Sequence, residues 1–124
     1  MHGQGAILVV DDDSAVRDVT RRLLSRQGFE VLEAESGAAA IDILEEAHHR
    51  IRFVLLDLTM PGMDGCETCR RMRELVPDVR VVLTSGHSEA ALRDRFAGSG
   101  IFGFLQKPFD LGTLLRVTKD AIAA

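Results

Sequence analysis

Polar residues whose side chains could take part in chemistry follow four short apolar runs in this 124-residue chain. Acids follow two of the runs, a hydroxyl the third and an amine the fourth: Asp11, Asp12, Asp13 and Asp57, then Thr84, then Lys107. Two or three carboxylates held close together repel one another and raise each other's pKa. A hard divalent cation bound through oxygen relieves that repulsion. Mg²⁺ suits so few protein ligands better than Ca²⁺ or zinc does.

Lys107 would bring a compact positive charge to such a site, and Thr84 a hydroxyl. A metal, a lysine and a hydroxyl around one carboxylate form a site for a small dianion, most obviously a phosphoryl group attached to that carboxylate. Each residue also has a structural explanation. The aspartates can cap a helix, Lys107 can form a salt bridge to Asp57, and Thr84 can be a strand-end hydroxyl. Four such groups in this order favour the phosphoryl site.

The segments between these groups alternate between strand and helix patterns. Short apolar runs bounded by turn signals are typical of buried strands, and they occur at residues 6–10, 29–34, 53–56, 79–83 and 101–105. Helical spacing of apolar residues follows each run, at about residues 14–27, 37–47, 65–76, 89–97 and 111–122. Either Asp13 or Ser14 can cap the first helix. The alternation predicts a doubly wound α/β fold, with a five-stranded parallel sheet flanked by five helices.

In a parallel sheet all the carboxyl ends of the strands lie at one edge, where open α/β proteins bind their ligands. The polar groups that follow the strands are therefore expected to converge there, although they come from distant parts of the chain.

Composition describes one soluble globular domain, with 46% hydrophobic and 27% charged residues. We expect a single domain over residues 1–124, with residues 1–5 as a flexible lead. The net charge of −4 argues against direct binding of nucleic acid. No apolar run approaches the roughly 18 residues of a membrane span, and no signal peptide is evident. Two cysteines do not form a secreted disulfide framework, which favours the cytoplasm.

Four motifs contain the polar groups: VVDDD at 9–13, LDLTMPGMDG at 56–65, LTSG at 83–86 and KPF at 107–109. Together they resemble the receiver domain of two-component response regulators, and the resemblance covers nearly the whole chain. It implies a sheet of order 2-1-3-4-5, as in the chemotaxis response regulator, whose fold is flavodoxin-like. It also implies a signalling protein that supports only its own phosphoryl transfer and dephosphorylation, and not an enzyme.

The resemblance assigns roles around the phosphoacceptor. Asp57 matches the residue that takes a phosphoryl group from a histidine kinase or a histidine phosphotransfer protein. Asp12 and Asp57 match direct Mg²⁺ ligands, together with the backbone carbonyl of Thr59. Asp11 matches an acid that holds the ion through water.

The resemblance also assigns the parts that respond to phosphorylation. Thr84 matches the hydroxyl that moves onto a phosphoryl oxygen, and Lys107 matches its ion-pair partner. Phe104 matches an aromatic switch whose surface would meet an unknown downstream protein. Gly86 should leave one side of the phosphoryl group open. The Lys107–Pro108 peptide bond is often cis in the family.

The later motifs, LTSGH at 83–87 and FLQKPF at 104–109, look most like receivers appended to hybrid histidine kinases. A stand-alone receiver is the other context that fits the sequence.

Three other functions fit parts of the sequence. A haloacid dehalogenase-type phosphatase also uses a strand-end aspartate and Mg²⁺, but it needs a second acid where Thr59 stands. A flavodoxin-like FMN carrier would place three aspartates against the phosphate of the flavin. Cys66 and Cys69 form a C-x-x-C near a helix start, which could be a redox pair. A redox pair would be expected directly after a strand, and this one is not.

Overall fold

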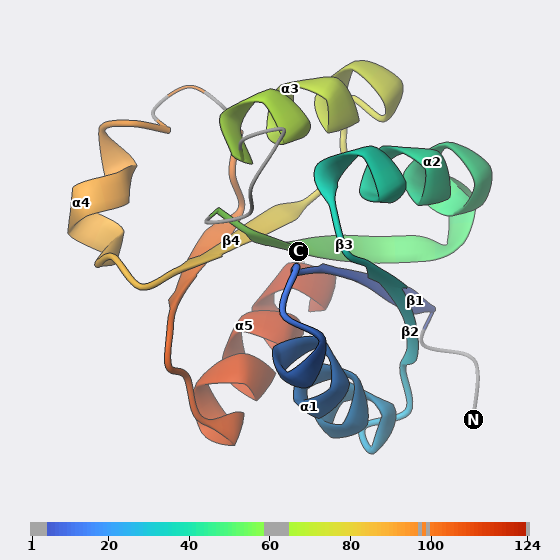
Figure 1. The fold of residues 1–124 in the computed structure, drawn as a ribbon, viewed down its shortest axis with the longest axis vertical. Helices are drawn as coiled ribbons and strands as arrows, with labels where there is room; N and C mark the ends of the chain where they lie inside the picture. The colour runs from blue at the N-terminus through green and yellow to red at the C-terminus, as the bar shows by residue number, and fades with distance from the viewer. Residues whose placement is uncertain (1–4, 59–64, 97, 99, 124) are drawn as a thin grey trace.

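The computed structural model describes residues 5–58, 65–96, 98 and 100–123. Strands and helices alternate along the chain (Figure 1). In order they are β1 (Ala6–Val10), α1 (Ser14–Ser25), β2 (Glu30–Ala34), α2 (Gly37–Ala47), a short 3₁₀ helix (His48–Arg50), β3 (Ile51–Asp57), α3 (Gly65–Leu75), β4 (Val81–Ser85), α4 (Glu89–Arg93), β5 (Gly103–Gln106) and α5 (Leu111–Ala123). Within the described ranges, no helix is both long enough and apolar enough to cross a membrane.

All five strands are parallel and form one sheet of order β2-β1-β3-β4-β5, which confirms the predicted fold class. The order reverses direction between β1 and β3, at the centre of the sheet. Helices α2, α3 and α4 lie on one face, and α1 and α5 lie on the other (Figure 1). The carboxyl ends of β1, β3, β4 and β5 therefore meet at one edge.

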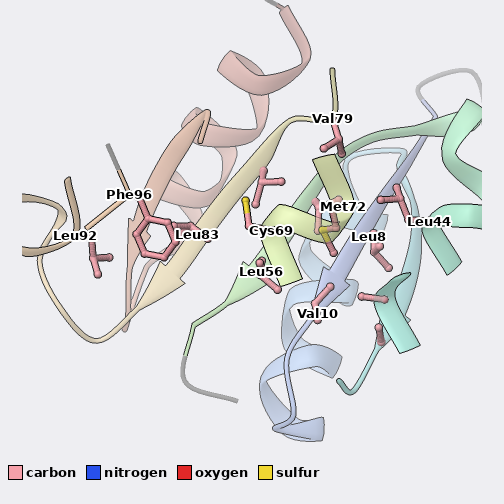
Figure 2. Close-up of a cluster of buried hydrophobic side chains, with 14 residues drawn as sticks. Leu8, Val10, Leu44, Leu56, Cys69, Met72, Val79, Leu83, Leu92 and Phe96 are labelled. Atoms are coloured by element: carbon pink, nitrogen blue, oxygen red, sulfur yellow. The ribbon is translucent and has the colours of Figure 1, made fainter. Parts of the chain in front are cut away.

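The central strands are buried on both faces, which explains their continuous apolar runs. Alternate residues of β1 point to opposite sides of the sheet. Leu8 and Val10 belong to the cluster beneath α2 and α3, which Figure 2 shows, whereas Ile7 and Val9 belong to the cluster beneath α1 and α5. The edge strand β2 instead exposes Glu30 and Glu33, and of its five residues only Ala34 is fully buried.

Local hydrogen bonds set where the helices begin. The Asp13 carboxylate accepts from the backbone N–H groups of Ala15 at 2.9 Å and Val16 at 3.3 Å. Asp13 is therefore the N-cap of α1, which settles the choice between Asp13 and Ser14. Ser36 and Ser88 cap α2 and α4 in the same way.

The boundaries of the later elements differ from the prediction. β4 begins at Val81 and continues through Ser85, two residues later than predicted, because Val79 closes a turn by donating its N–H to the Val76 carbonyl. β5 is Gly103–Gln106, where 101–105 was predicted. α4 ends at Arg93, earlier than predicted, and the predicted end at Ala97 lies outside the described residues.

Candidate functional site

The carboxyl edge of the sheet brings the strand-end polar groups together. Asp57 is the last residue of β3, and Asp11 directly follows β1; each is only 2–3% exposed. Thr84 is buried in β4, and its Cα is the register partner of Asp57. Lys107 directly follows β5. The predicted convergence of these residues is present in the structure.

Three acids of the site form a compact group. One carboxylate oxygen from each of Asp11, Asp12 and Asp57 lies within 4.8 Å of the others. Asp12 is exposed, whereas Asp11 and Asp57 are buried. Burial raises the pKa of Asp11, and repulsion from Asp57 adds to the rise, while hydrogen bonds from Lys107 and the Asp13 N–H oppose it. A set of hard oxygen donors with excess negative charge fits a divalent cation such as Mg²⁺.

Lys107 supplies positive charge to this group. Its Nζ lies 2.7 Å from Asp11 Oδ2 and 3.5 Å from Asp57 Oδ2. Burial lowers the pKa of Lys107, but the contacts with Asp11 and Asp57 outweigh it, so the net pKa is raised and the ammonium keeps its charge. The sequence analysis considered a salt bridge from Lys107 to Asp57. That contact is present, and it is longer than the contact with Asp11. Lys107 contacts two of the three grouped carboxylates, so the acids outnumber the ammonium that pairs with them.

Main-chain hydrogen bonds anchor the backbone of two of these residues to neighbouring strands. The Asp11 N–H donates to the Ala34 carbonyl at the end of β2, at 3.1 Å, and the Lys107 N–H donates to the Ser85 carbonyl at 2.7 Å. The Lys107–Pro108 peptide bond is cis, as the resemblance implied. These contacts tie the site to the rigid sheet.

Three further residues expected at the site have different outcomes. Phe104 lies on β5 opposite Leu83, is partly buried, and packs against the cluster beneath α2 and α3. Thr59 lies outside the described residues. At Gly86 a Cβ would meet no atom of the described residues within 4 Å.

An apolar groove beside the site did not emerge from the sequence. It measures about 560 Å³ and runs between α1 and the segment that follows β5, with Val16, Val19, Lys107, Pro108 and Phe109 among its lining residues. Val19 is 56% exposed although it is apolar. Val19 recurs at helical spacing with Val16 and Leu23, a pattern that in sequence is typical of a helix face packed on the core.

The cysteines of the C-x-x-C lie on α3 and are free thiols. Cys69 belongs to the core cluster of Figure 2, and burial raises its thiol pKa. A raised pKa lowers the thiolate fraction on which redox chemistry depends. Cys69 is therefore a core-packing residue, and Cys66 packs against the same cluster.

The family model for the response regulator receiver domain matches residues 7–119 of the chain. The chain belongs to this receiver family. Its members are signalling domains and not enzymes, which confirms the prediction and removes the support for the phosphatase alternative. The acidic pocket of Asp11, Asp12 and Asp57 is typical of a phosphoacceptor domain.

Individual relatives show how the receiver domain relates to longer proteins. The sensor kinase CckA of Brucella abortus is 36% identical over 122 residues, which is 98% of this chain and 13% of that protein. The response regulator MprA of Mycobacterium sp. (strain KMS) is 39% identical over 109 residues, which is 88% of this chain and 46% of that protein. The chain thus spans less than half the length of these relatives.

Among solved structures, a response regulator receiver domain protein from Clostridium thermocellum superimposes with a TM-score of 0.88 at 29% identity. The match covers 96% of this chain and 94% of that one. The similarity confirms the receiver fold.

Proposed function

We propose that Asp57 is the phosphoacceptor, and that it receives its phosphoryl group from the phosphohistidine of a histidine kinase or a histidine phosphotransfer protein. The observation that carries the proposal is the convergence of three carboxylates and one lysine at the carboxyl edge of the sheet. Asp57 is the acid of this group that ends the central strand.

Mg²⁺ is the cation we propose for the acidic group, with Asp12 and Asp57 as direct ligands and Asp11 acting through water. The backbone carbonyl of Thr59 would complete the protein ligands. When bound, the ion offsets the negative charge that gathers on the phosphoryl oxygens. The buried pair Asp11 and Asp57 supports this assignment, because burying two carboxylates near one ammonium leaves a charge that a cation neutralises.

The transfer step needs little covalent chemistry from the protein. A carboxylate oxygen of Asp57 attacks phosphorus, a new O–P bond forms, and the P–N bond of the donor breaks with its electron pair remaining on the imidazole. Lys107 already lies 3.5 Å from Asp57 and can pair with a phosphoryl oxygen. Thr84, the register partner of Asp57, would donate its hydroxyl to another.

Phosphorylation would then act as a switch between two conformations. A phosphoryl group that draws in Thr84 stabilises the conformer in which Phe104 turns inward, and the populations shift accordingly. Phe104 begins partly buried against the core, within reach of such a change. The remodelled surface around it would meet an unknown downstream protein.

The donor protein must dock where its phosphohistidine can reach Asp57. Lys107 and the exposed Val19 both line the apolar groove along α1, so the groove offers the donor protein a contact surface next to the site. We place the domain in the cytoplasm, either within a hybrid kinase, as the match to CckA suggests, or in a response regulator, as the match to MprA suggests.

The test is to incubate the chain with phosphoramidate and Mg²⁺ and to measure its intact mass. We expect a gain of one phosphoryl group in the parent and in Asp42→Asn, an exposed control on α2, and no gain in Asp57→Asn or with a chelator. A gain that persists in Asp57→Asn, or no gain in the parent at saturating donor, contradicts the assignment.

A further inference from the structure

Arg17, in the first part of α1, connects the acidic site to the edge strand β2. Its Nη1 donates to the backbone carbonyl of Asp11 at 2.8 Å, and its Nε donates to Glu33 Oε1 at 3.3 Å. The side chain is only 16% exposed, so the guanidinium is held between the two elements. Glu33 also lies 3.4 Å from Arg21 Nε, one turn further along α1.

The contact with Arg17 completes the restraints on Asp11. The Asp11 N–H donates to Ala34, and its carboxylate accepts from the Asp13 N–H at 2.9 Å and from Lys107 at 2.7 Å. Arg17 holds the remaining polar group, the carbonyl. That carbonyl belongs to the peptide bond joining Asp11 to Asp12, the two adjacent acids of the metal group.

Arg17 can influence a bound cation in two ways that have opposite signs. As a positive charge near the site, it repels a cation, an effect that the nearby Glu33 carboxylate and solvent reduce. As a donor to the Asp11–Asp12 peptide, it holds two acids in the geometry that a small cation demands. Removing Arg17 would strengthen cation binding in the first case and weaken it in the second.

We propose that Arg17 is a positioning residue for the cation site, acting through the Asp11 carbonyl and braced by Glu33. The inference rests on the proposed Mg²⁺ site. A charge-assisted hydrogen bond in a largely buried position is geometrically restrictive, whereas the repulsion is screened, so the positioning effect dominates. Outer partners of metal ligands typically contribute 10–100-fold in affinity. Because Asp11 is expected to hold the ion through water, we expect the lower end, about tenfold.

The test is a Mg²⁺ titration of the whole chain followed by backbone amide NMR shifts, which requires no phosphoryl transfer. We expect Arg17→Ala to bind Mg²⁺ about tenfold more weakly than the parent. The matched control is Arg22→Ala, which removes the same charge from the same helix but only a pairing with Asp18 at a 65% exposed position. The control should bind Mg²⁺ as the parent does. Unchanged or tighter binding by Arg17→Ala overturns the inference.

Arg17→Lys keeps the test decisive if the alanine variant does not fold. Lysine retains the charge but lacks the planar group that reaches the Asp11 carbonyl and Glu33 together. Weaker Mg²⁺ binding at unchanged charge supports positioning, and equal binding overturns it. If the parent binds no Mg²⁺, the proposed metal site fails and the inference with it. If the parent binds and Asp12→Asn abolishes binding while both Arg17 variants match the parent, only the inference about Arg17 fails.

Discussion

Lys107 offsets part of the negative charge of the site. Its ammonium contacts Asp11 and Asp57, which are both buried, while Asp12 lies in solvent. Water can solvate Asp12, but the two buried carboxylates depend on protein partners or a cation. We therefore expect Lys107 to stabilise the fold in the absence of metal as well as to serve the proposed chemistry.

We expect Lys107→Met to lower the free energy of unfolding by about 1–3 kcal/mol in metal-free buffer, because it removes the ammonium that contacts two buried carboxylates. Urea unfolding with and without Mg²⁺ measures the effect, and Mg²⁺ should stabilise the variant more than the parent. Lys119→Met, at an exposed position on α5, is the control and should change stability by less than about 0.5 kcal/mol. Equal stabilities of the two variants would show that Lys107 does not offset the acids.

The site residues that could be predicted from the sequence are the charged residues that follow apolar runs. Asp11 and Asp57 each end an apolar run, and Lys107 follows one after a single glutamine, so their place at the edge of a parallel sheet followed from the runs. Arg17 gave no such signal, because an arginine on the polar side of an amphipathic helix is ordinary. The preference of Lys107 for Asp11 over Asp57 depends on tertiary geometry, which no spacing in the sequence encodes.

At the scale of elements, the start of α1 is hydrogen-bonded to the acidic turn that follows β1. Asp13 caps the helix and Arg17 extends from it to Asp11, so the helix start and the acidic turn form one hydrogen-bonded unit. The helix that Asp13 caps also lines the apolar groove, with Val16 and Val19.

We expect Asp13→Ala to destabilise the protein by about 1 kcal/mol, since two backbone N–H groups of α1 lose their acceptor. Asp13→Asn should retain most of the stability, because asparagine is an equally good cap. Denaturant unfolding provides the measurement. Ser14→Ala tests the alternative cap and should have little effect; a loss as large as that of Asp13→Ala would assign the cap to Ser14.

Element boundaries were less predictable than element types. Val79 looks like the start of a strand because it is apolar and followed by others, but its burial serves the core beneath α3 and its N–H closes a turn. Thr84 and Ser85 look like the end of a strand, yet both pair with neighbouring strands, Thr84 with Asp57 and Ser85 with Gln106. Hydrophobicity reports burial, whereas strand limits depend on pairing partners that are distant in sequence.

At the scale of the whole molecule, the sheet separates two hydrophobic cores. Ile7 and Phe53 are register partners on β1 and β3 and share the cluster beneath α1 and α5. Val10, three residues along β1, belongs to the cluster on the other face. The sheet edge that carries the site is thus supported from both sides by independent packing.

This arrangement predicts how core substitutions combine. Ile7→Val should cost about 0.5–1.5 kcal/mol, and Val10→Ala somewhat more. Because the two side chains lie on opposite faces, their double variant should be additive within about 0.5 kcal/mol in urea unfolding. Ile7→Val combined with Phe53→Leu places both changes in one cluster, so these should deviate from additivity. Strong coupling between Ile7 and Val10 would instead mean that the sheet transmits packing changes across its faces. In that case a change beneath α1 would also reach the core against which Phe104 packs.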